Sequence, residues 1–158
     1  MAVGIRKATK KDMGAIVKIW IALMDFHKPF GRKMYQFKPN YAALYQKFLK
    51  KQLSSGKAAV FVAQDKRKII WYLMVDEEKL PPIYIFDKEA FVSDLFVKGS
   101  YRGKGIGTRL IGEAEKWGKT RKCHWLGIRS HVRNRRAINV YRQSGMQAHH
   151  LKLSKFLG

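Results

Sequence analysis

Apolar residues recur every three or four positions in the first third of the chain, which predicts two amphipathic helices. The first helix is expected over 10–26, preceded by Thr9 and Asp12, which resemble a capping box with Asp in place of Glu or Gln. The second helix is expected over 40–53, with Asn40 as its N-cap. The residues expected to face the core on this second helix are Tyr41, Leu44 and Phe48.

Strand-like runs and two further helices fill the rest of the chain. The runs expected to form strands occupy 3–7, 58–63, 69–75, 90–97, 125–130 and 147–153. A short polar turn over 65–68 makes the second and third runs a hairpin. Helices are expected over 105–119 and over 134–144, where Gly145 ends the second of them. The residues expected to face inward on the 105–119 helix are Ile106, Leu110, Ile111 and Ala114.

This order of elements predicts a single α/β domain of the α+β type over 1–158. Its sheet should be mixed and mostly antiparallel, with helices flanking it. The connection from the 90–97 strand through a helix to the 125–130 strand should be a parallel βαβ crossover.

The composition is strongly basic, with 33 Lys and Arg against 11 Asp and Glu and a formal net charge of +22. Such a charge attracts polyanions, so nonspecific binding to nucleic acid or ribosomes is expected. The charges are spread along the chain, and neither a helix-turn-helix nor a zinc-ligand spacing is present. A dedicated DNA reader and a metal site are therefore not expected.

Cysteine use and hydropathy indicate a cytoplasmic protein. The single Cys123 can form no intramolecular disulfide, which favours a reducing compartment. No apolar run approaches the ~20 residues of a membrane span, and the N-terminus lacks the layout of a signal peptide. No membrane association is expected.

A glycine-rich turn follows the 90–97 strand, with Gly103, Gly105 and Gly107 at alternate positions. Glycines let the backbone turn sharply and approach a ligand, and a helix N-terminus offers free N–H groups and a positive dipole end. The turn is therefore suited to phosphate or pyrophosphate, although such a turn can also join a strand and a helix without binding anything. Its spacing matches neither the dinucleotide fingerprint nor the P-loop.

Two motifs, in matching order and spacing over 94–146, make the chain resemble the GNAT superfamily of N-acetyltransferases. The family's cofactor motif, Arg/Gln-x-x-Gly-x-Gly/Ala, stands here as Arg102, Gly105 and Gly107. The second motif, Asn-x-x-Ala-x-x-x-Tyr-x-x-x-Gly-Phe, stands here as Asn134, Ala137, Tyr141, Gly145 and Met146, with Met in place of Phe.

The resemblance implies transfer of an acetyl group from acetyl-CoA to a primary amine, of a small molecule or a protein, by direct attack. The residues that would hold the pyrophosphate are Arg102, Gly103, Lys104, Gly105, Ile106, Gly107 and Thr108. The pantetheine arm would lie along the strand like an added strand, against Leu95, Phe96 and Val97. The Leu95 N–H would polarise the thioester carbonyl.

The resemblance also implies acid–base roles. Tyr141 matches the family's general acid, which protonates the departing CoA thiolate, and a phenol of pKa about 10 is suited to that. Asn134 matches a position that helps to hold the cofactor, and it can also cap its helix. The candidates for the general base are Asp94, Glu89, His131 and His27. Some family members use no dedicated base.

Departures from the family pattern leave the acceptor open. Trp71 stands where many relatives have Gly, so its indole either narrows the acceptor cleft or fills the core, and 98–100 replaces an Asp-Pro pair. Segments 27–37 and 80–87 are expected to line the acceptor site. The polycationic surface disfavours polyamines and suits acidic acceptors or a target within a ribonucleoprotein.

An alternative function is a catalytically weak module that binds acyl-CoA, nucleic acid or ribosomes. Many members of the family dimerise, so a homodimer is a further expectation for this chain.

Overall fold

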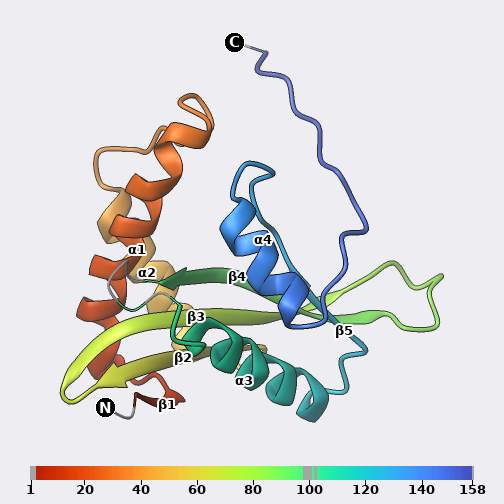
Figure 1. Cartoon of the computed structure of the whole chain (residues 1–158), viewed down its shortest axis with the longest axis horizontal. Helices are drawn as coiled ribbons and strands as arrows, with labels where there is room; N and C mark the ends of the chain where they lie inside the picture. The colour runs from red at the N-terminus through yellow and green to blue at the C-terminus, as the bar shows by residue number, and fades with distance from the viewer. Residues whose placement is uncertain (1–2, 98–100, 102, 158) are drawn as a thin grey trace.

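The computed structural model describes residues 3–97, 101 and 103–157, in which five strands form one sheet. In the order in which they neighbour one another, the strands are β1 (Gly4–Lys7), β2 (Ala58–Asp65), β3 (Lys68–Lys79), β4 (Lys88–Val97) and β5 (Trp125–Ile128) (Figure 1). The pairs β1–β2, β2–β3 and β3–β4 are antiparallel, and β5 runs parallel to β4. The mixed sheet and its single parallel crossover confirm the fold class expected from the sequence.

Helices pack on both faces of the sheet. The helices are α1 (Met13–His27), α2 (Tyr41–Leu53), α3 (Ile106–Thr120) and α4 (Arg135–Gln143), and two short 3-10 turns flank α1 over Lys10–Asp12 and Lys28–Phe30. α1 and α2 cover one face, and α3 and α4 lie on the other (Figure 1). In the part of the chain that the structure describes, no helix combines the length and apolarity needed to span a membrane.

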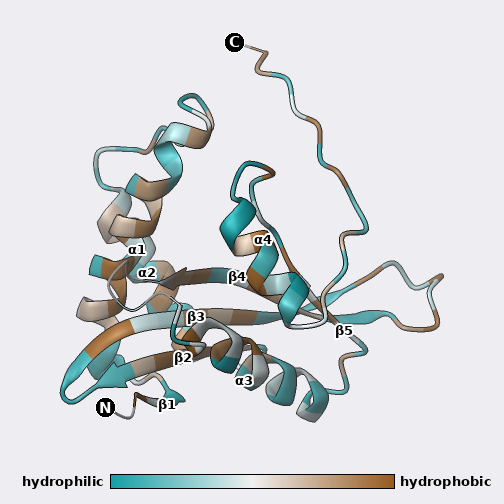
Figure 2. Cartoon of the chain, in the orientation of Figure 1, coloured by the Kyte–Doolittle hydropathy of each residue, from teal (hydrophilic) through white to brown (hydrophobic). Residues whose placement is uncertain are grey.

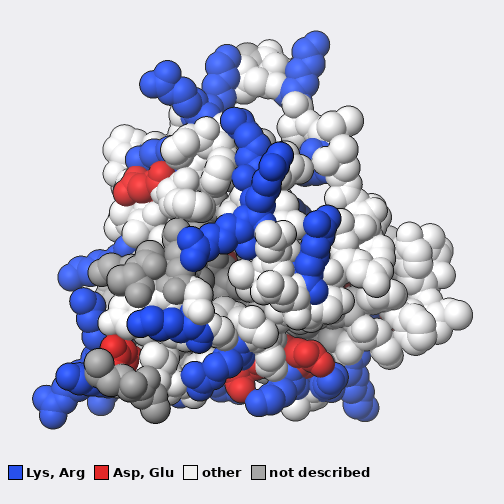
Figure 3. Space-filling view, in the orientation of Figure 1, with Lys and Arg blue, Asp and Glu red and all other residues white. Residues whose placement is uncertain are grey.

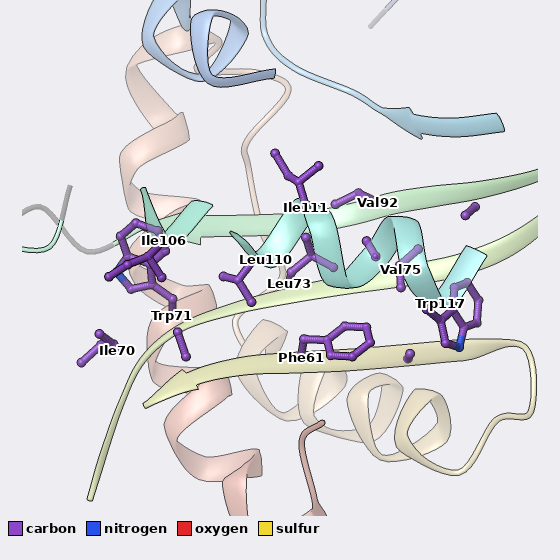
Figure 4. Close-up of a cluster of buried hydrophobic side chains, with 14 residues drawn as sticks. Phe61, Ile70, Trp71, Leu73, Val75, Val92, Ile106, Leu110, Ile111 and Trp117 are labelled. Carbon is purple, nitrogen blue, oxygen red and sulfur yellow. The ribbon is translucent and has the colours of Figure 1, made fainter. Parts of the chain in front are cut away.

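Side chains alternate along β2 and β3 and so supply two apolar clusters, and Figure 2 shows the apolar residues concentrated on these central strands. The larger cluster lies under α3 and includes Phe61, Leu73, Val75, Ile106, Leu110, Ile111, Ala114 and Trp117 (Figure 4). The smaller cluster lies under α1 and α2 and contains Ile16, Tyr45, Leu49, Val60, Val62, Tyr72 and Met74. All four residues expected to face inward on α3 are buried, which confirms that part of the prediction.

The buried face of α2 differs from the prediction. Leu44 and Phe48 are 46% and 41% exposed, whereas Tyr45 and Leu49 are buried. The Tyr45 ring stacks on Trp20 of α1 with 3.9 Å between centroids, and this contact fixes the rotation of the helix. Both sets of residues satisfy helical spacing, so the repeat alone could not choose between them.

The expected strand over 147–153 is also wrong. Residues 146–157 form neither strand nor helix, and Figure 1 shows this segment leaving the domain after α4. A strand needs a neighbouring edge to pair with. The edge strand β5, which pairs with β4 on one side, is only four residues long and offers a short edge on its other side. The tail instead passes β5, where His149 meets Trp125 with 6.5 Å between ring centroids.

A β-bulge in β4 decides which side chains face which helices. Met74 pairs with Asp94, but the next residue, Val75, pairs with Val92, so Ser93 is an extra residue in β4. Ala90 and Val92 face the cluster under α3, and strict alternation would have turned Asp94 into that apolar cluster as well. Because of the bulge, Leu95 faces the cluster instead and Asp94 faces α2.

Candidate functional site

The glycine turn leads into an exposed helix N-terminus. Gly103 and Gly105 have φ of 80° and 69°, a left-handed conformation that costs other residues about 1–2 kcal/mol. A Cβ at either position would have no heavy atom within 4 Å, so the space beside both glycines is open. The first helical hydrogen bond of α3 runs from the Arg109 N–H to the Gly105 carbonyl at 3.1 Å. Among the described residues, the preceding amides of the first turn have no intrahelical acceptor, so they are suited to bind an anion.

The other residues of the turn divide between core and solvent. Ile106 is 2% exposed and belongs to the cluster under α3. Gly107 is also buried, and a Cβ there would meet Trp71 at 3.6 Å and Val140 at 3.7 Å. Lys104 and Thr108 are exposed, and the Lys104 ammonium lies 5.5 Å from the Tyr101 ring centre. Arg102 and segment 98–100 lie outside the described residues.

Trp71 fills the core. It is buried beside Gly107, on the face under α3, so it does not narrow the opposite face of the sheet. Its buried indole Nε1 has no hydrogen-bond partner among the described residues. The hypothesis that Trp71 restricts an acceptor cleft is thereby excluded in favour of the packing interpretation.

The second half of β4 lacks a neighbour on one side. β5 pairs with β4 only from Glu89 to Val92, and within the described part of the chain no other strand takes its place beyond Val92. On the other side, Leu95 and Val97 remain paired with Leu73 and Trp71 of β3. An extended ligand could therefore lie along this half of β4 as an added strand.

The side chains of this half of β4 point to different layers. Leu95 packs against the cluster under α3, and Phe96 lies on the opposite face with its ring 6.2 Å from that of Phe26 of α1. The backbone groups of this half of β4 therefore face the unpaired edge, away from β3. Its side chains pack against the helices on the two faces of the sheet. Such anchoring suits a strand that binds through main-chain groups.

Tyr141 and Asn134 are positioned by α4. Asn134 is the N-cap, and its Oδ1 accepts a hydrogen bond from the Ala137 N–H at 3.3 Å. Gly145, with φ of 83°, ends the helix as the motif predicts. The half-buried Tyr141 packs against the cluster that also contacts Leu95. Burial raises the pKa of Tyr141 to about 12, so its phenol is protonated at neutral pH and can donate a proton.

Asp94 is part of a polar network between β3, β4 and α2. Its Oδ2 accepts a 2.7 Å hydrogen bond from the Tyr45 hydroxyl, which lies 3.1 Å from the Tyr72 hydroxyl. Burial raises the pKa of Asp94, while hydrogen bonds from both tyrosines act in the opposite direction. Burial also raises the pKa of Tyr45 and of Tyr72, which keeps both phenols protonated as donors to the carboxylate.

Glu89 lies far from Leu95 along the sheet. Their partners on β3, Glu78 and Leu73, are five residues apart, which at about 3.4 Å per residue is roughly 17 Å. Burial, followed by the charge of Glu78, raises the pKa of Glu89. At that distance Glu89 cannot take a proton directly from an amine placed beside Leu95.

Two histidines flank a contact between the segments after α1 and after β5. The Phe30 ring stacks on His131 with 5.0 Å between centroids, and the Arg133 guanidinium donates to the Phe30 carbonyl at 2.7 Å. The Nδ1 of His131 accepts the Arg133 N–H at 3.1 Å, so that lone pair is not available to a substrate. Burial, with a smaller contribution from His131, lowers the pKa of His27 and favours its neutral form.

The structure thus brings most of the predicted residues to one region. The α3 N-terminus, the unpaired half of β4 and Tyr141 of α4 share the face under α3, and Asp94 lies on the other face of the same strand. The acceptor segments are separated: 27–37 follows Phe26, whose ring meets that of Phe96, whereas 80–87 joins β4 at its opposite end. Sequence reasoning missed Tyr45 and Tyr72, whose roles depend on contacts between distant segments.

Comparison with known proteins matches residues 20–146 to the family model described as acetyltransferase (GNAT) family. An uncharacterized N-acetyltransferase of Methanocaldococcus jannaschii is 27% identical over 143 residues, which cover 90% of this chain and 60% of that protein. The chain thus spans about 60% of the length of that relative.

Solved structures agree on the fold. The tetramutant of the BH1408 protein of Bacillus halodurans has a TM-score of 0.85 at 23% identity, with 98% of this chain and 99% of that chain covered. A predicted acetyltransferase of Clostridium acetobutylicum, solved with acetyl-CoA, has a TM-score of 0.78 at 19% identity, covering 97% of this chain and 96% of the other. The match to the family model confirms the resemblance noted in the sequence: the chain belongs to the acetyltransferase (GNAT) family.

Proposed function

We propose that the chain transfers the acetyl group of acetyl-CoA to a primary amine by direct nucleophilic attack. The observation that carries this proposal is the half of β4 beyond Val92, which is unpaired on one side among the described residues and leads into the glycine turn. A ligand with an extended amide-containing arm and a pyrophosphate end fits such a strand followed by a helix N-terminus. The structural neighbour solved with acetyl-CoA supports this assignment.

The residues divide into binding and positioning tasks. The free first-turn amides of Ile106, Gly107 and Thr108, with the positive end of the α3 dipole, would hold the pyrophosphate. The backbone of 95–97 would hold the pantetheine arm, and the Leu95 N–H would polarise the thioester carbonyl. Figure 3 shows many Lys and Arg side chains on the side of α3 and α4, and this charge favours a ligand with several phosphates.

Two side chains would carry out the proton transfers: one takes a proton from the amine, and the other gives a proton to the thiolate. Asp94, as the general base, would accept the proton that the attacking amine loses, since its raised pKa makes it a stronger base than an ordinary carboxylate. The nitrogen forms a bond to the carbonyl carbon, and the carbon–sulfur bond breaks. Tyr141 would give its phenolic proton to the departing thiolate and recover one from solvent. Asp94 is preferred to Glu89 because Glu89 lies roughly 17 Å further along the strand.

Thermal unfolding with acetyl-CoA, CoA and ATP tests the binding part of the proposal. Acetyl-CoA at ~100 times its dissociation constant should stabilise the fold by about 2.7 kcal/mol, a rise in Tm of roughly 5–10 °C. CoA should act similarly and ATP only weakly. Thiol release in the presence of a primary amine then tests transfer. Absence of both stabilisation and thiol release would refute the proposed activity.

The basic surface supports a second role, nonspecific polyanion binding. Arg135, Arg136 and Arg142 are exposed on α4, a helix without an acidic residue, and Figure 3 shows Lys and Arg spread over this side of the molecule. Binding of this kind weakens steeply with salt. A titration of duplex DNA and RNA at increasing salt should therefore show affinity that is lost near physiological ionic strength.

A further inference from the structure

Three elements converge on the carboxyl group of Asp94. The bulge in β4 sends this group to the sheet face under α1 and α2, where Tyr72 of β3 also lies. Asp94 pairs with Met74 and Tyr72 pairs with Phe96, so Tyr72 and Asp94 are diagonal neighbours, and an aromatic side chain can span that separation. Tyr45 reaches the same carboxyl group from α2. The orientation of Asp94 therefore depends on β3 and α2 as well as on its own strand.

The two carboxyl oxygens of Asp94 have different surroundings. Oδ2 accepts the 2.7 Å hydrogen bond from the Tyr45 hydroxyl, whereas Oδ1 accepts none from the residues that the structure describes. Among those residues, the Trp71 indole nitrogen is the only buried side-chain nitrogen or oxygen without a hydrogen-bond partner. Oδ1 also lacks a partner, so it must be in contact with solvent. One oxygen is thus held by the protein, and the other is left accessible.

The two tyrosines act on the carboxylate as donors. The Tyr45 hydroxyl donates its single hydrogen to Asp94, so Tyr72 is the donor in the 3.1 Å contact between the two hydroxyls. A chain of donors of this kind strengthens each hydrogen bond in it. Burial raises the pKa of Tyr45 and of Tyr72, so neither phenol can itself take a proton from an amine at neutral pH or lose its own. Their effect on the reaction must therefore pass through Asp94.

Packing fixes the two phenols in place. Tyr72 is 0% exposed and Tyr45 is 7% exposed, and both belong to the cluster under α1 and α2. The Tyr45 ring stacks on Trp20 of α1 with 3.9 Å between centroids and 4° between the ring planes. Rings packed in this way have little freedom to move, so their hydroxyls define a fixed position for Oδ2. A fixed Oδ2 in turn restricts rotation of the carboxyl group and sets the direction of Oδ1.

The titratable groups that face Asp94 are Tyr72 and Asp76 of β3 and Tyr45 of α2. Burial raises the pKa of Asp94, hydrogen bonds from Tyr45 and Tyr72 lower it, and the charge of Asp76 raises it. In the described part of the chain, Asp94 forms no ion pair with Lys, Arg or His. The two phenols are therefore the groups there that stabilise the charged form of Asp94.

We propose that Tyr45 and Tyr72 are positioning residues for acetyl transfer, which hold Asp94 by Oδ2 and leave Oδ1 to take the proton of the attacking amine. This inference rests on the proposed acetyltransferase function and assigns residues to the proton transfer at the same site. The amine gives its proton to Oδ1, and its nitrogen provides the electron pair that bonds to the carbonyl carbon. Asp94 then returns the proton to solvent through the same accessible oxygen.

Tyr72→Phe and Tyr45→Phe each remove one hydroxyl group and test the proposal. Thiol release is measured across pH with the fastest of three acceptors: ethanolamine, hexylamine and glucosamine. Each substitution should lower kcat about tenfold, because the carboxyl group is held less firmly. The acidic limb of the profile should move to higher pH, because the lost hydrogen bond lowers the pKa of Asp94. Tyr41→Phe is the matched control one turn earlier on α2, where the ring packs on Phe37, and should change neither quantity.

The KM for acetyl-CoA should stay unchanged in both variants, since the two phenols lie under α1 and α2 and the α3 N-terminus lies on the other face. The Tm of each variant reports any loss of stability separately. A lower Tm with unchanged kcat and an unmoved acidic limb, in both variants, would mean that the tyrosines only stabilise the fold, and it overturns the inference.

A double substitution shows whether the tyrosines act through Asp94. Asp94→Asn should lower kcat, and adding Tyr72→Phe to it should lower kcat no further, because groups that act as a unit are not additive. A further tenfold loss in the double variant, or an unchanged kcat in Asp94→Asn alone, overturns the inference and leaves the acetyltransferase function standing. Lack of thiol release with all three amines overturns the inference as well, and lack of stabilisation by acetyl-CoA in addition overturns the proposed function.

Discussion

Replacing Gly105 with Ala directly tests the anion seat, the proposed pyrophosphate site formed by the glycine turn and the first amides of α3. The residue has φ of 69°, and no heavy atom lies within 4 Å of a Cβ built there, so the methyl group meets no steric clash within the protein. The left-handed conformation costs Ala about 1–2 kcal/mol, and the lower entropy of the unfolded chain returns about 0.4–1 kcal/mol. The net loss of stability should be about 1 kcal/mol, or a fall in Tm of roughly 2–4 °C.

The substitution should reduce the affinity for acetyl-CoA more than it reduces the stability of the fold. The methyl group would occupy the open space through which an anion reaches the first amides of α3. Hydrogen bonds to a charged group are worth about 1.5–3 kcal/mol each, so losing one should weaken acetyl-CoA binding at least about tenfold. Isothermal titration with acetyl-CoA measures this effect, and the Tm without ligand measures the change in folding.

Gly112→Ala on α3 is the matched control. A Cβ at Gly112 also has no heavy atom within 4 Å, but its backbone is helical and it lies two turns beyond the seat. Alanine is favoured over glycine in a helix by about 0.8–1 kcal/mol, so this variant should be more stable and bind acetyl-CoA as before. A folded Gly105→Ala protein that binds acetyl-CoA with unchanged affinity would falsify the assignment of the pyrophosphate seat.

Three further substitutions address catalysis and packing. Tyr141→Phe should lower kcat by about a hundredfold with little change in the stabilisation by acetyl-CoA, and an unchanged kcat at every pH would exclude Tyr141 as the general acid. If Asp94 is the base, the rate should fall as pH drops through its raised pKa. Tyr45→Phe removes a hydrogen bond that lowers this pKa, so the acidic limb of the pH–rate profile should move to higher pH; a limb that stays in place contradicts the role of Asp94. Gly118→Ala would bring two Cβ atoms to 2.8 Å, at Ala90, and should cost about 1–3 kcal/mol in denaturant unfolding, whereas equal stability would contradict this close packing.

Local sequence patterns were sufficient for most of the helices and strands and for the glycine turn. The inward residues of α3 follow from a repeat in which a single face is apolar, and the two motifs mark a turn and a helix whose conformations are local properties. Gly103, Gly105 and Gly145 adopt the left-handed conformation that glycine favours, so their positions in the sequence already indicated where the chain turns.

Contacts between distant segments decided the rest. The repeat in α2 permits two buried faces, and the choice of Tyr45 comes from Trp20 of α1 and from a carboxyl group 49 residues away, on Asp94. The bulge at Ser93 reverses the alternation of β4 and sends Asp94 to the sheet face under α1 and α2, an effect that depends on pairing with β3.

The sequence by itself determined the number and type of most elements, the family motifs and the net charge. Only the tertiary structure decided that Asp94 lies beside Tyr45 and Tyr72, because strand register, a bulge and helix packing place residues from separate elements together. It also decided that the tail after α4 stays unpaired, since the edge strand β5 is too short to bind it along its length. Periodicity records only the neighbours of a residue along the chain, whereas register, bulges and packing determine its neighbours in space.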